Sequence, residues 1–196
     1  MIRHAILAAS LLLMAAGPPP PSSPPPAPAE KPVMQPTRDA VVGYHLAPAS
    51  GEAIDVRVML RAGGQLLRMD LPDYSIILVQ PATRQLTLVV PTERTALELP
   101  WSDGPQPLFL VDDSKRYTRK GEATIAGQRC TMWDAVADRA RSSVCVTADG
   151  IILRQLTFDA VGRRSLVEAV VIRYEPLGAA DFEVPPGFQR MVGTAQ

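Results

Sequence analysis

The sequence predicts a mainly β domain, in which antiparallel strands follow one another as a curved or closed meander with few short helices. Three observations predict this fold class. Apolar and polar residues alternate with a period of two in the long segments. Glycine, proline and Asp-Gly turn signals separate these segments at short intervals. The helix candidates are short and contain proline or glycine, which favours strands as the main elements.

The N-terminus, residues 1–17, has the pattern of a secretory signal peptide. A small basic region precedes an apolar run from Ala5 to Ala16, which is shorter than the ~20 residues needed to span a bilayer. We expect cleavage after Ala16 or at the later Ala27-Pro28-Ala29. No cysteine follows the run, so no lipid attachment is expected there. The sequence therefore predicts a periplasmic or secreted protein.

Residues 18–36 are rich in proline, with serine and alanine between the prolines. Proline lacks an amide donor and fixes φ, so this segment cannot join a sheet, and we expect an extended, disordered linker. It would act as a spacer, dock on a proline-binding partner, or have no role beyond connection. Residues 37–192 are long enough for one domain with one core.

Turn signals divide the first half of the domain into strands. Gly63-Gly64 supplies the positive φ values of a tight hairpin, and Pro72 and Pro81 mark the next two turns. The strands expected between these turns cover residues 42–46, 54–61, 65–71, 74–79 and 84–90. Their alternation predicts one buried face for each strand. The next segment, residues 91–97, fits a turn of helix or another strand.

In the second half, Asp149-Gly150 is the clearest hairpin signal. It links the strand that contains Cys145 to a strand over 151–158, and a looser turn at 160–164 leads to a strand over 166–174. Residues 103–120 contain prolines and paired aspartates and are expected to be irregular. Residues 175–182 are a weak candidate for a helix.

The chain has two cysteines, Cys130 and Cys145, on either side of a turn around 137–141. Pairing of antiparallel strands across this turn would place them opposite each other within bonding range. Export permits a disulfide, and closing a loop of about 15 residues would stabilise the fold by about 3 kcal/mol. A reactive or metal-bound pair is the alternative, but the C-x-x-C spacing of such sites is missing.

Charge and aromatic content exclude two classes of protein. Lys and Arg total 20 and Asp and Glu total 20, and the basic residues are scattered, so no nucleic-acid-binding face is expected. The aromatic content of 5% argues against an integral outer-membrane protein, which needs aromatic residues at both membrane interfaces.

Catalytic motifs are also missing from the sequence, including G-x-S-x-G, H-E-x-x-H, G-x-G-x-x-G and the P-loop. His45 is the one histidine left after signal removal. Asp112-Asp113 would either bind a cation or be solvated charges on a loop. Glu168 would either point into a cavity or lie on a solvent-exposed strand face. We therefore expect no enzyme activity, no metal site and no cofactor.

The cysteine region resembles a known family. The run GEATIAGQRCT at 121–131 and CVTADGIILR at 145–154 are similar to the IAGxxC…CxTxDG signature of an uncharacterised exported bacterial family (DUF4412-like). Residues 86–99 and 182–188 resemble further parts of its pattern. The resemblance implies the fold of the LolA and LolB lipoprotein carriers, a strongly curved, unclosed antiparallel sheet with an apolar cavity on its concave side. The chain lacks LolB's lipid-attachment cysteine and LolA's cavity-filling helices.

We therefore expect a non-catalytic periplasmic protein that binds a lipid, an acyl chain or an acylated protein on its concave face. The residues expected to line this hydrophobic ligand site are Val56, Val58, Leu60, Leu67, Met69, Leu78 and Leu88. Methionine suits an adaptable apolar wall. The alternative role for these side chains is a plain core. The alternative function is an envelope protein-interaction module, which would bind a protein through a sheet edge or the proline-rich segment without a lipid ligand.

Overall fold

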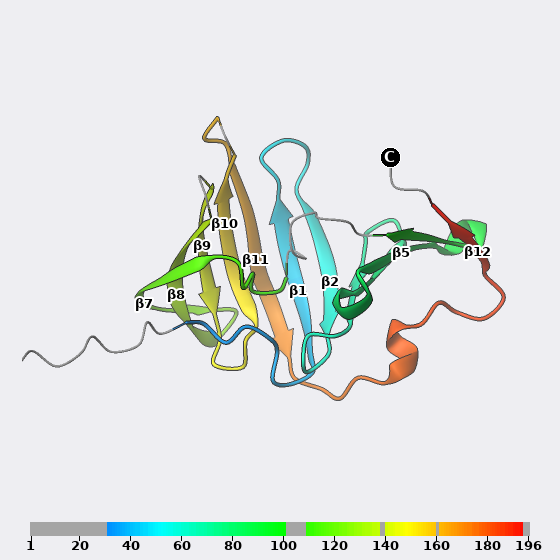
Figure 1. The fold of residues 1–196 in the computed structure, drawn as a ribbon, viewed down its shortest axis with the longest axis horizontal. Helices are drawn as coiled ribbons and strands as arrows, with labels where there is room; N and C mark the ends of the chain where they lie inside the picture. Colours follow the sequence, from blue (N-terminus) through cyan, green and yellow to red (C-terminus); the bar gives the residue numbers. More distant parts are fainter. Residues whose placement is uncertain (1–30, 101–108, 138–139, 160, 194–196) are drawn as a thin grey trace, which may run out of the picture.

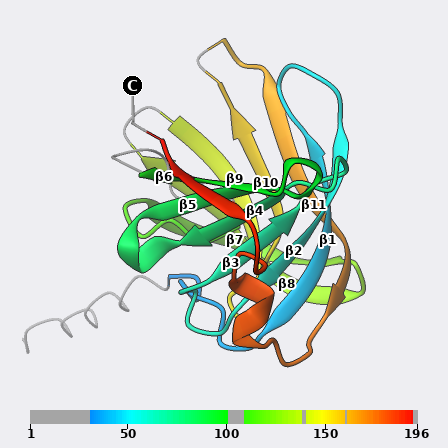
Figure 2. The same cartoon turned by 90° about the vertical axis from the view of Figure 1, so that its right-hand side faces the viewer.

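A computed structural model describes residues 31–100, 109–137, 140–159 and 161–193. These residues form a 12-stranded sheet in the order β12-β6-β5-β4-β3-β2-β1-β11-β10-β9-β8-β7. Figure 1 shows β7–β11 standing beside β1 and β2, and Figure 2 shows β4–β6 running at a steep angle to β9–β11. The sheet is therefore strongly curved and unclosed, as expected. The predicted signal peptide and residues 18–30 lie outside the described residues.

The elements are β1 (Ala40–Ala47), β2 (Ile54–Leu60), β3 (Leu67–Asp70), β4 (Ile76–Gln80), η1 (Pro81–Thr83), β5 (Gln85–Val90), η2 (Pro91–Glu93), β6 (Thr95–Pro100), β7 (Arg116–Ile125), β8 (Gln128–Ala137), β9 (Ala140–Val146), β10 (Ile152–Phe158), β11 (Arg164–Arg173), η3 (Ala179–Phe182) and β12 (Gln189–Val192). Helical structure in the described residues is limited to the 3-10 turns η1, η2 and η3. Among these residues, we find no helix with the length and apolar character that a membrane span requires.

Two antiparallel meanders, β1–β6 and β7–β11, join through the pairing of β1 with β11. The strands predicted in the first half, and those around Cys145, 151–158 and 166–174, are confirmed. The segment 91–97 contains both expected elements, because the 3-10 turn η2 leads into β6.

Two strands differ from the sequence prediction. Residues 116–120, expected to be irregular, begin β7. This strand lies at a sheet edge with most of its residues exposed on both faces, so it lacks the apolar alternation that marks a half-buried strand. The strand β12 was not predicted, and it pairs in parallel with β6, unlike the antiparallel pairs elsewhere in the sheet.

The main core lies on the concave face, because its buried residues come from both meanders. It contains Val42, Val58 and Leu60 from the first meander and Leu153 and Ala169 from the second. Apolar side chains from the two halves of the sheet thus meet inside the curve, and their burial holds the bent sheet together.

The cysteines form the expected disulfide. Cys130 on β8 and Cys145 on β9 are bonded, with Cα atoms 5.4 Å apart, and both side chains are buried in the main core. The sequence prediction placed the two cysteines directly opposite each other, and this detail is wrong. The hairpin register pairs Ala137 with Ala140, which places Met132 opposite Cys145 and Cys130 two residues further along the strand. The disulfide indicates an oxidising, extracytoplasmic compartment.

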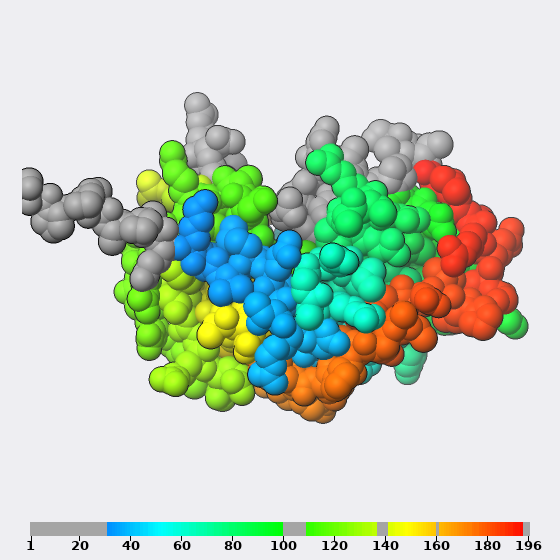
Figure 3. Space-filling model, turned by 60° about the horizontal axis from the view of Figure 1, so that its bottom comes forward, coloured from blue at the N-terminus to red at the C-terminus, as the bar shows by residue number. Residues whose placement is uncertain are grey.

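The end of the predicted linker, residues 31–36, lies against the domain. Pro36 is buried, and its carbonyl accepts a hydrogen bond from Gly63 N–H (2.7 Å), while Thr37 N–H donates to the carbonyl of Asp149 (2.9 Å). Figure 3 shows this blue segment lying between residues of the two meanders. Gly150 has a φ of +80°, and a Cβ there would collide with the backbone of Gln35. The packed part of the chain therefore starts before residue 37.

Candidate apolar binding site

Two rows of apolar side chains cross the concave face from β1 to β6. Residues that pair across an antiparallel ladder share a face, so the rows follow from the strand register. The first row is Val42, Val58, Met69, Ile77, Leu88 and Leu97, and the second is Ala40, Leu60, Leu67, Val79, Leu86 and Leu99. Both rows contain only apolar residues, so the concave face is apolar across these strands.

Burial decreases along both rows. Val58 and Leu60 on β2 are 0% and 1% exposed. At the other end the side chains are only partly buried. These partly exposed residues, which we call the β3–β6 apolar strip, are Met69, Ile77, Leu86, Leu88, Leu97 and Leu99. The first row continues into Met191 on β12, which pairs with Leu97 and is 44% exposed.

The buried end of the rows is closed by Phe109, which precedes β7. The Phe109 ring is 2% exposed and lies 4.8 Å from the ring of Tyr44 on β1. The Tyr44 hydroxyl donates a 2.6 Å hydrogen bond to the carbonyl of Ile152, and burial raises the pKa of Tyr44 far above its usual value. This end of the concave face is therefore core.

The outer face of β4–β6 is closed by the C-terminal segment. Val184 and Phe188 pack against a buried cluster of Leu78, Val89 and Ala96. The same strands are therefore covered by the chain on their outer face and partly exposed on their concave face. This difference makes the apolar strip the best candidate for binding a hydrophobic molecule.

The residues predicted from the sequence fall into three groups. Met69 and Leu88 belong to the apolar strip. The residues Val56, Val58, Leu60 and Leu67 lie in the buried core. Leu78 was expected on the concave face, but it lies in the outer-face cluster, where it is 5% exposed.

The face of Leu78 was misjudged because β4 is apolar on both faces. In the run Ile76-Ile77-Leu78-Val79, alternation alone does not show which residues point inward. The register answers this, because Ile77 pairs with Met69 and Leu88. Four strip residues that we did not predict are Ile77, Leu86, Leu97 and Leu99. The alternation of leucine in 86–88 and 97–99 is the signal that would have indicated the last three.

The polar candidates from the sequence lie elsewhere and are paired. His45 Nδ1 lies 2.7 Å from Asp55 Oδ1, with both side chains well exposed. Glu168 accepts a 2.5 Å hydrogen bond from Arg154 Nε, which supports a wet strand face for it.

The Asp112 loop is also satisfied by its own chain. Asp112 Oδ1 accepts hydrogen bonds from the backbone N–H and hydroxyl of Ser114, and Lys115 Nζ lies 3.6 Å from Oδ2. The carbonyl of Asp112 accepts from Tyr117 OH (2.8 Å), and burial together with the nearby Asp112 charge raises the pKa of Tyr117 to about 12. Within the described ranges, no group of three or more His, Cys, Asp or Glu is placed to hold a metal.

Comparisons with known proteins show similarity of fold. No protein-family model and no curated protein sequence matches the chain. An uncharacterized conserved protein from Thermus thermophilus matches with a TM-score of 0.58 and 13% identity, over 80% of this chain and 91% of that one. MucB matches with a TM-score of 0.55 and 11% identity, over 80% of this chain and 60% of MucB.

MucB in complex with MucA(peri) also matches, with a TM-score of 0.51 and 11% identity, over 78% of this chain and 56% of that one. The chain thus spans little more than half of MucB. At these identities the matches establish a shared fold, and the curved, unclosed sheet is the part of the sequence resemblance that the structure bears out.

Proposed function

We propose that this protein is a non-catalytic periplasmic binding protein that holds a hydrophobic guest, such as a lipid acyl chain, on the β3–β6 apolar strip. The observation that carries the proposal is the change in burial along the two apolar rows, from a closed core at β2 to partly exposed side chains at β5 and β6. An acyl chain laid along the strip would complete the burial that the protein's own side chains leave incomplete.

Burial of an acyl chain on the strip is expected to provide enough free energy for measurable binding. Each buried methylene contributes about 0.8 kcal/mol, so about ten methylenes contribute about 8 kcal/mol before the cost of association. A gain of this size corresponds to affinity no tighter than about micromolar. The unbranched side chain of Met69, with Met191 at the end of the row, would adapt to guests of different shape. We therefore expect moderate affinity and broad selectivity.

The compartment fits this role. The signal-like N-terminus and the Cys130–Cys145 disulfide support export to the periplasm. Acyl chains in an aqueous compartment need an apolar surface to cover them, and the strip provides one.

The alternative is an envelope protein-interaction module with no lipid ligand. One observation favours it, which is that MucB, a protein of similar fold, has been solved in complex with MucA(peri). An extended apolar peptide segment would then take the place of the acyl chain on the strip.

Native mass spectrometry of protein isolated gently from the cell envelope distinguishes these functions. We expect an added mass of lipid size on the wild type, and less of it on the Leu88→Gln variant. A matched control is Val171→Gln, which alters an exposed valine on the outer face of β11 and should keep the lipid. Protein free of lipid that carries a co-purified polypeptide would favour the alternative.

A further inference from the structure

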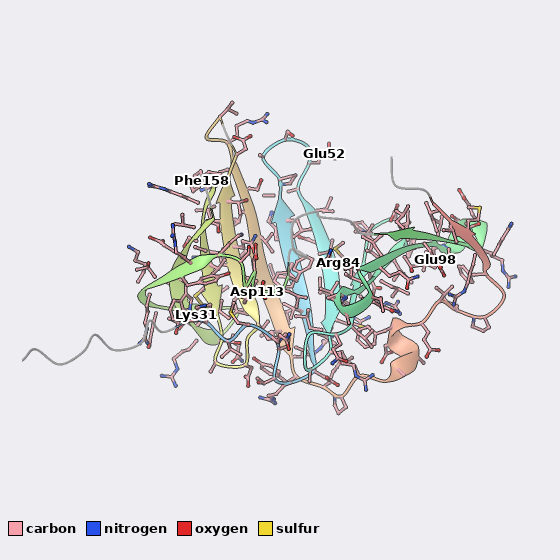
Figure 4. All side chains as sticks on the ribbon, viewed as in Figure 1. Lys31, Glu52, Arg84, Glu98, Asp113 and Phe158 are labelled. Atoms are coloured by element: carbon pink, nitrogen blue, oxygen red, sulfur yellow. A yellow bond between two sulfur atoms is a disulfide. The ribbon has the colours of Figure 1, made fainter. Side chains whose placement is uncertain are left out.

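Two hairpin tips project from the same end of the sheet. They are the loop between β1 and β2 and the loop between β10 and β11, and both views show them extending beyond the other strands (Figures 1 and 2). The β1–β2 loop is bonded to the start of β11, because Ala49 N–H donates a 2.9 Å hydrogen bond to the hydroxyl of Ser165. Figure 4 labels Glu52 and Phe158, one near each tip.

Asp159 makes several hydrogen bonds at the β10–β11 tip. Its Oδ1 accepts hydrogen bonds from the backbone N–H of Val161 (3.0 Å) and Arg163 (2.8 Å), and its Oδ2 accepts from Arg163 Nε (2.7 Å). The bond from the Arg163 side chain is the largest of several that lower the pKa of Asp159. Gly162 has a φ of +82°, which the tight turn requires. These hydrogen bonds therefore link Asp159 to Val161 and Arg163 in an exposed part of the hairpin.

The β10–β11 tip presents apolar side chains to solvent. Val161 is 76% exposed and Phe158 is 47% exposed. Single exposed apolar residues are common on protein surfaces, but a β-branched residue and an aromatic residue together at a projecting tip are suited to contact with another apolar phase.

Arginines flank Phe158 on both neighbouring strands. Arg164 on β11 is its ladder partner, and Arg141 on β9 directly precedes Ser142, which pairs with Thr157 beside Phe158. The carboxylate of Asp159 is occupied by Arg163, so it does not neutralise the two flanking arginines. Glu52 places a negative charge on the other tip, which makes the β10–β11 hairpin the basic one of the two.

We propose that the β10–β11 hairpin docks the protein on a bilayer surface that carries anionic phospholipid headgroups. Val161 and Phe158 enter the boundary between headgroups and acyl chains, and Arg141 and Arg164 contact the phosphates while their aliphatic stems cover apolar surface. This combination of a small apolar wedge and a few basic residues gives weak, reversible attachment. The inference is independent of the apolar strip, because no strip residue takes part in it.

Sedimentation with phospholipid vesicles tests the proposal. The full mature chain is mixed with vesicles of phosphatidylcholine alone or with added phosphatidylglycerol, and the bound fraction is measured. We expect the wild type to bind the mixed vesicles more strongly, and the pair Phe158→Ser and Val161→Ser to reduce this binding by about tenfold or more. The pair Arg141→Gln and Arg164→Gln should remove most of the dependence on phosphatidylglycerol.

The matched control is the pair Val170→Ser and Val171→Ser, since these valines are 60% and 47% exposed on β11 away from the tip. This control should bind as the wild type does, and thermal unfolding should confirm that all variants are folded. Wild type that fails to bind either vesicle would overturn the proposal, as would a Phe158 and Val161 double variant that binds like the wild type. A wild-type protein that binds vesicles but carries no lipid on the apolar strip would count against the proposed function and would leave the docking proposal standing.

Discussion

The two ends of the concave face have the same chemistry and opposite exposure. At β1 and β2 the apolar rows are covered by Phe109 and by side chains from the second meander, and Val42 and Val58 are fully buried. At β5 and β6 the same rows continue through Leu88 and Leu97, which are partly exposed. Alternating apolar residues therefore build a core where another part of the chain covers them and a candidate binding surface where none does so completely.

Removal of Phe109 should have the largest effect on the closed end. The Phe109→Ala change leaves a cavity beside Tyr44, and we expect a loss of about 3–5 kcal/mol in the free energy of unfolding. Urea denaturation monitored by circular dichroism measures this. A loss below about 1 kcal/mol would show that Phe109 does not close the core.

Removal of the disulfide should have the next largest effect. Replacing Cys130 and Cys145 together by alanine releases a constraint across a separation of 15 residues, and we expect a loss of about 3 kcal/mol. The same denaturation experiment measures it, with a thiol titration of the unfolded wild type as control. Free thiols in the exported wild type would contradict this part of the account.

The buried hydrogen bond of Tyr44 gives a smaller effect. The Tyr44→Phe change keeps the ring contact with Phe109 but leaves the carbonyl of Ile152 without its donor, and we expect a loss of about 1–3 kcal/mol. Thermal unfolding provides the comparison. An unchanged midpoint would mean that water replaces the hydroxyl, so this end would be less closed than the structure indicates.

Asp39 gives a pH-dependent effect near the closed end. Its carboxylate accepts hydrogen bonds from the backbone N–H groups of Ala62 (2.8 Å) and Leu177 (2.9 Å), which lower its pKa below the ordinary value of 3.8. A lowered folded-state pKa adds stability that is present above the unfolded value and is lost as the pH falls through the folded value.

We therefore expect the Asp39→Asn variant to be less stable than the wild type at neutral pH by about 1–2 kcal/mol. This difference should begin to shrink as the pH falls below about 4, near the pKa of the unfolded state, and should be lost as the pH falls through the lower pKa of the folded state. Denaturation curves of both proteins above and below pH ~4 show whether the stability difference shrinks or grows on acidification. A difference that grows on acidification would refute the assignment.

Leu88→Ala should have the smallest effect on stability, although it removes three carbon atoms and Tyr44→Phe removes only a hydroxyl oxygen. Leu88 is already partly exposed, so we expect a loss of about 1 kcal/mol, well below the cost of a fully buried leucine. The measurement is again urea denaturation. A loss as large as that of Phe109→Ala would mean that the strip is core.

Much of the fold follows from the sequence because its signals are local. Gly63-Gly64 and Asp149-Gly150 mark turns that the structure contains, and the cysteine pair indicates the disulfide. These features depend on residues that are close together along the chain or on chemistry that only one pairing can satisfy.

The candidate site was harder to predict because it depends on distant contacts. The pattern of Val58 and Leu60 is the same kind of alternation as that of Leu86 and Leu88. Core and strip differ in their contacts with Phe109 and with the second meander, which are distant in sequence. The side on which Leu78 lies depends on the register of β4, which an apolar run does not specify.

Titration with the apolar fluorescent probe N-phenylnaphthylamine tests most directly whether the open end of the rows is a binding surface. We expect the wild type to bind the probe. Met69→Gln and Leu88→Gln should each weaken the probe affinity about tenfold, while the outer-face variant Val171→Gln should leave it unchanged. Equal probe affinity in the wild type and both strip variants would show that the β3–β6 apolar strip is not the binding surface.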